Sequence, residues 1–408
     1  MVERRKDSKN RVLKTGEIER KQGNYQYSWG TGKNRRFIYA RSLKELREKE
    51  ADISRDLNDG LRTDNINLTL NDMYNVWVDL KKGLKPNTLN NYKYMYDHFV
   101  KDSLGKFKLR NLRKTDIRRF YNELIDINGL KVNTLDTIHL VIHQILDLAV
   151  DDDLVRKNVS NHGLKELKKI RGLHSNKRKA LTIKQQKLFL DYLIENQKYK
   201  HWYPIFSVML GTGLRVGELT GLRWRDIDFD NNVINVNHTL VFYDRSKANR
   251  TGFGINTPKT EAGYRSVPMI DTVRKTLIKY KKFISDNDIK SVDIIDGYHD
   301  FVFVNRFGHV QHQGTLNKAL KRIIRDANFE ALKKNPSIKE EDLLPNFSCH
   351  TLRHTFTTRL IESGMNIKVI QEALGHSDIQ TTLNIYADVT KDLKRDEFTK
   401  FNDFISKN

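Results

Sequence analysis

Apolar side chains repeat at helical spacing over one continuous stretch of this chain, from Leu68 to about Val155. Its first run consists of Leu70, Met73, Tyr74, Trp77 and Leu80, which lie three or four residues apart. This spacing gathers the side chains on one face of a helix, and that face must be buried against another element. Further helices are predicted to begin at Pro86 and to span about 114–127 and 131–150. We therefore predict an independent helical bundle over residues 64–155.

Residues 1–63, before the bundle, combine a strand pattern with a strong positive charge. Residues 1–41 hold twelve Lys or Arg and four acids. Aromatic runs at 25–29 and 36–39 flank turn glycines, as in a hairpin. Ser42 and Glu45 have the spacing of a capping box, which predicts a helix from there to about Asn58. The segment is predicted to form a small three-stranded sheet with one helix, since its aromatic residues disfavour a solvated tail.

After the bundle, the pattern changes twice more. Residues 156–180 hold nine Lys or Arg and a single acid, with little apolar periodicity. They predict a basic linker, which either follows a DNA backbone or is simply a soluble hinge. Residues 181–408 form a mixed α/β domain, mainly α, with a C-terminal tail. Its expected β-ribbon covers 232–268, and its expected helices cover 182–196, 202–210, 214–222, 271–285, 315–328, 351–363, 366–374 and 379–386.

The charge of the chain limits the kinds of partner it can have. Its 73 Lys and Arg exceed its 51 Asp and Glu, which gives a formal net charge of +22. An excess of this size favours a polyanion such as DNA. A membrane is disfavoured, because no apolar run approaches the ~20 residues that cross a bilayer, and the charged N-terminus has no apolar segment of a signal peptide after it. The single cysteine, Cys349, excludes an internal disulfide framework and fits a reducing cytoplasm.

Four short stretches of the C-terminal half carry side chains suited to chemistry. They are GTGLRVGEL with Arg215 and Glu218, TPKTEAGYRSVPM with Lys259, HTLRH with His350 and Arg353, and LGHSDIQTTLNIYADV with His376 and Tyr386. Residues three apart share a helix face, so Glu218 is expected beside Arg215. Each residue alone has an ordinary interpretation as an ion pair, a turn lysine, a loop cap or a packing aromatic. The order of the four stretches in the chain and their residue patterns, taken together, outweigh these interpretations.

Together the four stretches closely resemble the tyrosine recombinases, in particular the integrases of conjugative transposons and temperate phages. GTGLRVGEL matches the segment of the first catalytic arginine, HTLRHTF the His-x-x-Arg box, and LGHSDIQTTLNIYA the closing histidine and nucleophilic tyrosine. The resemblance covers the whole length. RRKDSKNRVLKTGEIERKQGNYQY looks like the arm-type DNA-binding domain of transposon integrases, and the helical bundle corresponds to their core-binding domain.

The resemblance implies a role for each matched residue. Arg215 and Arg353 clamp the non-bridging oxygens of a phosphodiester with planar forks that lysine lacks. Tyr386 is the nucleophile, and it displaces the 5′ oxygen to give a 3′-phosphotyrosine. His350 and His376 donate hydrogen bonds or assist proton transfer, and Lys259 protonates the leaving oxygen. Glu218 holds Arg215 in position without contacting the phosphate itself. Because the covalent intermediate conserves bond energy, neither ATP nor another cofactor is expected.

The DNA contacts are expected at both basic segments. The candidate DNA-binding residues are Arg20, Lys21, Tyr25, Tyr27, Trp29, Arg35, Arg36, Lys177, Arg178 and Lys179. Expected partners are double-stranded attachment-site DNA with core and arm sequences, three further copies of the chain on that DNA, a small excisionase and a DNA-bending accessory protein. The expected location is the cytoplasm of a bacterial host.

Three other interpretations are less favoured. A recombinase for chromosome-dimer resolution or DNA inversion would use the same chemistry, but such proteins usually lack an N-terminal domain like residues 1–63. A non-catalytic architectural protein would need the basic surface without the catalytic side chains. A zinc site at Cys349, His350 and His376 is disfavoured, because adjacent residues point to different faces of a helix and no CxxC pair exists.

The tail after residue 387 has an apolar stripe at roughly helical spacing. This stripe either docks on a neighbouring copy of the chain or packs on its own domain.

Overall fold

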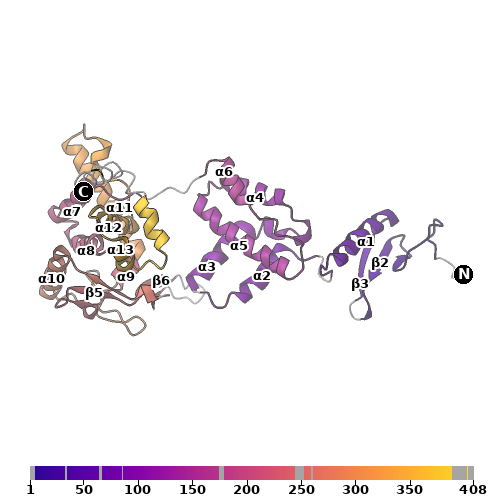
Figure 1. The fold of residues 1–408 in the computed structure, drawn as a ribbon, viewed down its shortest axis with the longest axis horizontal. Coiled ribbons are helices and arrows are strands. Elements are labelled where there is room, and N and C mark those ends of the chain that lie inside the picture. The colour runs from indigo at the N-terminus through magenta and orange to yellow at the C-terminus, as the bar shows by residue number, and fades with distance from the viewer. Residues whose placement is uncertain are drawn as a thin grey trace. The chain divides into compact units, whose positions relative to one another are not determined.

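The computed structural model describes residues 5–32, 35–63, 67–84, 86–173, 179–243, 252–258, 261–387 and Asn402. The chain divides into two compact units, Met1–Asn176 and Lys177–Asn408 (Figure 1). The C-terminal tail predicted to dock lies, apart from Asn402, outside the described residues. Among the helices described, none is long and apolar enough to cross a membrane.

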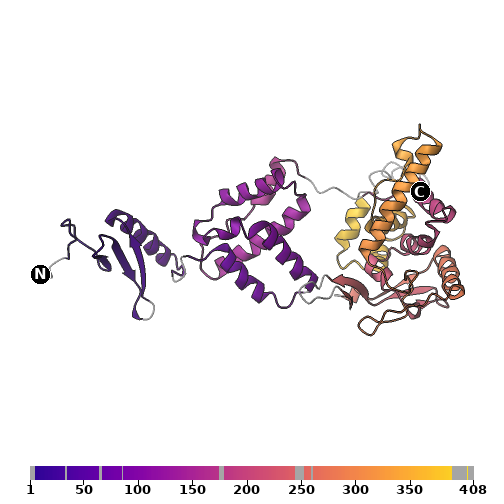
Figure 2. The same ribbon diagram turned by 180° about the vertical axis from the view of Figure 1, so that it is seen from behind.

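The first unit begins with a three-stranded antiparallel sheet and one helix, as predicted. The strands are β1 (Glu17–Glu19), β2 (Tyr25–Trp29) and β3 (Arg36–Ala40), in that order across the sheet. Helix α1 (Leu43–Asn58) lies on one face of this sheet (Figure 2). The hydroxyl of Ser42 caps α1 by accepting a hydrogen bond from the backbone N–H of Glu45. Ser42 therefore caps the helix where the sequence predicted its start, although the Glu45 carboxylate accepts from the backbone N–H of Arg41, so the reciprocal half of the predicted capping box does not form.

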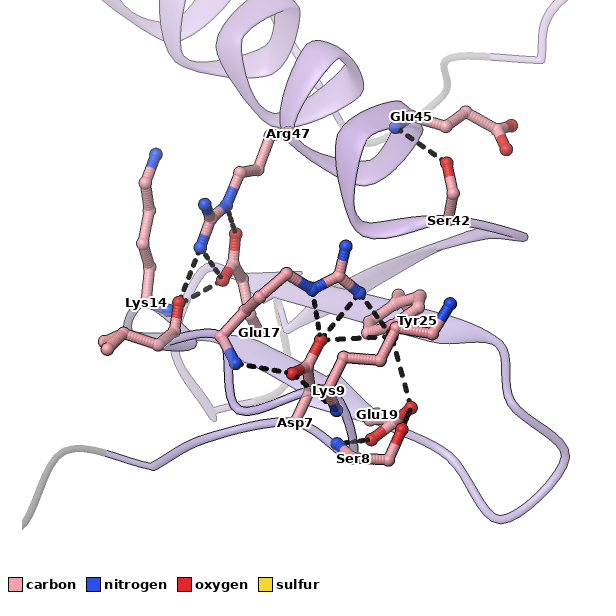
Figure 3. A network of polar contacts seen from close by, with 12 residues as sticks. Asp7, Ser8, Lys9, Lys14, Glu17, Glu19, Tyr25, Ser42, Glu45 and Arg47 are labelled. Carbon is pink, nitrogen blue, oxygen red and sulfur yellow. Dashed lines mark hydrogen bonds and ion pairs between the residues drawn. The ribbon is translucent and has the colours of Figure 1, made fainter.

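A polar network ties residues 5–14 to this sheet (Figure 3). The carboxylate of Asp7 accepts a hydrogen bond from Nε of Arg11 at 2.7 Å. The hydroxyl of Tyr25 lies within hydrogen-bond distance of the carboxylates of Asp7, at 3.2 Å, and Glu19, at 3.1 Å. Buried Glu17 pairs with Arg47 of α1 at 2.9 Å. The two buried carboxylates, Asp7 and Glu17, thus each have a guanidinium partner, which a buried charge requires.

The second part of this unit is a helical bundle. Its helices are α2 (Leu70–Leu80), α3 (Pro86–Met95), α4 (Lys114–Asp126), α5 (Val132–Asp151) and α6 (Gly163–Ile170). The first four confirm the predicted helices. Helix α6 corrects the linker predicted over 156–180, because its Leu164 and Leu167 are buried in the core of the bundle. The three apolar residues of this short helix, Leu164, Leu167 and Ile170, are too few to stand out as a period within such a basic segment.

The second unit is mainly helical with two small sheets. Its helices are α7 (Ile183–Glu195), α8 (Tyr203–Thr212), α9 (Val216–Thr220), α10 (Asp271–Asp286), α11 (Gln313–Lys334), α12 (Cys349–Glu362) and α13 (Ile367–Leu374). Its strands are β4 (Ile227–Asp228), β5 (Val233–Val236), β6 (Thr239–Tyr243), β7 (Gly252–Asn256) and β8 (Arg265–Pro268). One sheet has the order β4-β5-β8 and the other pairs β6 with β7. The predicted ribbon over 232–268 is therefore divided between two sheets. A last helical segment, 379–387, matches the helix expected there.

Candidate active site

The second unit brings Arg215, Glu218, Arg353 and His376 into one hydrogen-bonded cluster. Arg215 precedes α9, Arg353 lies on α12, and His376 follows α13. These residues are up to 161 positions apart in the chain, from 215 to 376. They meet where the end of α8, the start of α9 and the end of α13 converge on α12.

Arg215 is held at the start of α9 by the side chain of Glu218. Helix α8 ends at Gly213, whose φ of 61° is left-handed, and a Cβ there would lie 2.3 Å from the ring of Phe356. Glycine is thus required at this turn. The carboxylate of Glu218 accepts from the backbone N–H of Arg215 and from its Nη1, both at 2.8 Å. The side chain of Arg215 remains 42% exposed, so it can reach a ligand.

Glu218 is buried and shared between two guanidiniums. Besides Arg215, it accepts hydrogen bonds from Nη1 and Nη2 of Arg265 at 3.1 and 2.8 Å. Burial would raise the pKa of Glu218, but the hydrogen bond from Arg265 and the charges of Arg265 and Arg215 lower this pKa to about 2. Glu218 is consequently a carboxylate at neutral pH and fixes the orientation of Arg215.

Arg353 is buried beneath the site, with 4% of its surface exposed. Its Nη1 donates to the carbonyl of Gly213 at 2.7 Å, and its Nη2 to the carbonyl of Leu374 at 2.8 Å. Burial and the nearby charge of Arg215 lower the pKa of Arg353 to about 9. Even so, the guanidinium is charged at neutral pH, and the two carbonyl bonds hold it in place.

His376 accepts a hydrogen bond from Arg353. The two nitrogens, Nη2 of Arg353 and Nε2 of His376, are 2.9 Å apart, and the guanidinium can only donate. Nδ1 of His376 therefore carries the ring proton and donates it to the hydroxyl of Thr382 at 2.9 Å. Burial, together with the charges of Arg353 and Arg215, lowers the pKa of His376 to about 4. The imidazole is therefore uncharged at neutral pH, and the hydrogen bond that it accepts helps to hold the guanidinium of Arg353 in place.

The remaining predicted residues have different positions. His350 is exposed near the start of α12, three residues before Arg353, and its charge also lowers the pKa of His376. Tyr386 lies on the helical segment 379–387 and is 40% exposed. Lys259 falls outside the described residues.

Arg265 was not among the predicted site residues. It begins strand β8, and 6% of its side chain is exposed. Besides its bonds to Glu218, its Nε donates to the carbonyl of Ala373 at 2.8 Å. Arg265 lies within the stretch that carries Lys259, but nothing in its spacing distinguishes it from an ordinary strand arginine.

Cys349 is poorly suited to bind a metal ion. It is fully buried, and burial raises the pKa of its thiol to about 12. A thiol must lose its proton to bind zinc, so this position is a poor ligand. Among the residues that the structure describes, no three His, Cys, Asp or Glu side chains are grouped so that they could hold a metal ion.

The candidate DNA-binding residues fall into three groups. Arg20, Lys21, Arg35, Arg36 and Lys179 are exposed, while Tyr27 is half-buried. The prediction was wrong for Tyr25 and Trp29, which pack between the sheet and α1 with 4% and 9% of their surface exposed. An aromatic strand residue faces the core whenever a helix covers its side of the sheet. Lys177 and Arg178 lie outside the described residues.

Three parts of the chain match known protein families. Residues 179–392 match the phage integrase family, residues 1–57 match the DNA-binding domain of Tn916 integrase, and residues 69–125 match the N-terminal SAM-like domain of phage integrases. Similar proteins include the transposase from transposon Tn1545 of Streptococcus agalactiae and that from Tn916 of Enterococcus faecalis. Each is 30% identical over 98% of this chain and 98% of its own length.

Solved structures show the same fold. The Tn1549 transposon integrase in complex with transposon right end DNA aligns with a TM-score of 0.70 at 28% identity, covering 82% of this chain and 99% of that one. A lambda integrase tetramer bound to a Holliday junction aligns with a TM-score of 0.54 at 18% identity, covering 92% and 95%. The second likeness concerns the fold alone.

The neutral state of His376 predicts how stability depends on pH. Folding lowers its pKa from 6.5 to about 4, so below pH 6.5 the unfolded chain takes up this proton first. The free energy of unfolding should fall as the pH drops from about 6.5 to about 4, by less than the ~1.4 kcal/mol per pH unit of a whole proton because the ring is only half-buried. Urea unfolding of His376→Gln should show a weaker pH dependence than the wild type. Equal pH dependence in both would contradict the neutral assignment.

Proposed function

The chain belongs to the phage integrase family of tyrosine recombinases, and we propose that it integrates and excises a conjugative transposon through a covalent bond between Tyr386 and DNA. A tyrosine-type site-specific recombinase cleaves and rejoins DNA strands, and this is the activity of the chain. The residues that carry out the steps are our proposal, as are its domains: 1–63 for arm DNA, the helical bundle through α6 for core DNA, and 181–408 for catalysis.

One observation supports the catalytic proposal most strongly. Nη2 of Arg215 donates to the carbonyl of Gly375 at 2.8 Å, while Nη2 of Arg353 donates to the carbonyl of the preceding residue, Leu374. Two guanidiniums bonded to consecutive carbonyls lie close enough to serve one phosphate. Like charges repel, so an anion bound between them would stabilise their proximity. A phosphodiester with two non-bridging oxygens is an anion of this kind.

The proposed reaction begins when Arg215 and Arg353 bind the non-bridging oxygens of the scissile phosphate. The hydroxyl oxygen of Tyr386 attacks phosphorus, the bond to the 5′ oxygen breaks, and a 3′-phosphotyrosine forms. The clamp counters the negative charge that builds in the transition state. His350 accepts the proton that the Tyr386 hydroxyl loses, and Lys259 supplies the proton that the departing 5′ oxygen needs. The 5′ hydroxyl of another strand then reverses the step without ATP.

His376 has two candidate roles in this reaction. The sequence suggested that it donates a hydrogen bond to the phosphate. Its Nε2, however, accepts from Arg353, so we assign His376 first to the orientation of that guanidinium. A direct hydrogen bond from the ring to the phosphate would require a proton on Nε2, which is the accepting nitrogen here.

The N-terminal sheet is proposed to bind the arm sites. The face away from α1 exposes Phe37 and Tyr39, at 46% and 51%. Arg35 and Arg20 lie over these two rings, at 5.8 and 5.2 Å from the ring centroids. A small sheet of this kind fits the major groove, where arginines read guanine and contact phosphates. The Tn916-type match over residues 1–57 supports a transposon integrase over a chromosome-dimer resolvase.

The proposal extends to assembly and location. Exchange of four strands calls for four protomers on the DNA, and the lambda integrase that shares this fold is a tetramer on a Holliday junction. A small excisionase and a DNA-bending protein would set the direction of the reaction. The expected location is the cytoplasm of a bacterial host, where the DNA is.

The role of Tyr386 can be tested with a suicide duplex nicked near the cleavage site. Tyr386→Phe removes one hydroxyl, so DNA affinity should change little while the covalent adduct disappears. Tyr203→Phe is the matched control, since it removes the same hydroxyl from the second unit at the start of α8, at the opposite end of that helix from the turn at Gly213, and it should form the adduct normally. Denaturing gels measure both. An adduct that survives Tyr386→Phe would show that another residue is the nucleophile.

The arm-binding role predicts a difference in salt dependence. Replacing Arg20 and Arg35 with Ala should weaken binding to duplex DNA from the element ends and reduce the salt slope by roughly 2, because each arginine is expected to neutralise one phosphate. Replacing Lys44 and Arg55 on exposed positions of α1 removes the same charge and should have little effect. Fluorescence anisotropy across a salt series measures both. If the two double variants lose equal affinity, the sheet face is not the binding surface.

A further inference from the structure

We propose that Arg265 is a positioning residue whose buried guanidinium balances the charge of Glu218, so that the charge of Arg215 remains available to the scissile phosphate. This inference rests on the proposed function of the site. Glu218 must stay ionised to orient Arg215, but an ionised carboxylate also opposes the guanidinium it orients. A second arginine on the same carboxylate resolves this conflict.

The geometry separates the tasks of the two arginines. Arg265 uses both Nη atoms on the two carboxylate oxygens of Glu218, at 3.1 and 2.8 Å. Arg215 uses only Nη1 on this carboxylate, at 2.8 Å. The side chain of Arg265 is 6% exposed, whereas that of Arg215 is 42% exposed. Arg265 is thus the bidentate partner of Glu218, and Arg215 is the one that a ligand can reach.

The net charge of the cluster shows what the loss of Arg265 would change. Arg215, Arg265 and Arg353 carry three positive charges against the single negative charge of Glu218. The site therefore has a net charge of two, which suits a phosphate whose negative charge increases in the transition state. Without Arg265 the net charge falls to one, and Glu218 would interact with Arg215 alone.

Arg265 also holds the loop that leads to His376. Arg265, Arg353 and Arg215 donate to the carbonyls of Ala373, Leu374 and Gly375 respectively, which are three consecutive residues. These carbonyls end helix α13, where positive charge is favourable. Gly375 has a φ of 63°, and a Cβ there would lie 3.0 Å from Nη1 of Arg265. The loop therefore fits closely over this guanidinium.

The test compares two suicide duplexes. In the second, a methyl group replaces one non-bridging oxygen of the scissile phosphate, so the phosphorus centre is neutral and needs less positive charge. Arg265→Met should slow cleavage of the ordinary phosphate by about 10- to 100-fold, less than the ~10²–10³ of a lost direct donor, but slow the methylphosphonate by less than about threefold. Arg265→Lys keeps the charge and should stay closer to the wild type.

The matched control is Arg223→Met. Arg223 is another buried arginine of the second unit, with a bidentate bond to Asp226 at 2.9 and 2.8 Å. Its loss should affect the two duplexes equally. If Arg265→Met also slows both duplexes equally, Arg265 only supports the fold and the proposal is overturned.

A second comparison holds even if Arg265→Met does not fold alone. Once Glu218→Gln removes the negative charge, the further change Arg265→Met should alter phosphate cleavage by less than about threefold. A further loss of more than about tenfold would overturn the proposal. The proposed function fails separately, because it requires the wild-type chain to form an adduct through Tyr386; without that adduct both ideas fall.

Discussion

The bonds between three arginines and three consecutive carbonyls at the end of α13 are the interaction on which the site depends. Arg265 begins strand β8, Arg353 lies on helix α12, and Arg215 precedes helix α9. All three side chains donate to carbonyls of residues 373–375, which hold them in fixed positions relative to one another. Burying guanidiniums is costly unless their donors are satisfied. The carbonyls and Glu218 satisfy those donors, so the positive charge is already in place before DNA arrives. Such preorganisation is the main source of electrostatic catalysis.

The same cluster explains the protonation states around it. Arg353 is charged despite a lowered pKa, and His376 is neutral because burial and two guanidiniums disfavour a third positive charge. The hydrogen bonds from Arg353 to His376 and from His376 to Thr382 then link the clamp to the helical segment that carries Tyr386. A shift of that segment would change the support of Arg353. The proposed phosphate clamp and the proposed nucleophile are thereby connected through one imidazole.

The helices and strands could be predicted from patterns between neighbouring residues. The features that the sequence analysis missed depend on contacts between residues that are far apart in the chain. The N-cap at Ser42 and the helical spacing from Leu70 onward depend on neighbours in sequence, and both were predicted correctly. Helix α6 was missed because its stability comes from packing on the bundle. Tyr25 and Trp29 were misassigned because only the covering helix decides which face of a strand is buried. Arg265 was missed because its partner Glu218 is 47 positions away.

The most direct test of this account is a structure of the chain on a DNA duplex in which vanadate replaces the scissile phosphate, as an analogue of the transition state. We expect Arg215 and Arg353 to donate to the equatorial oxygens and the hydroxyl oxygen of Tyr386 to be an apical ligand. Arg265 should remain bidentate on Glu218. A vanadate bound by Arg265, or one whose apical ligand is not Tyr386, would contradict the account.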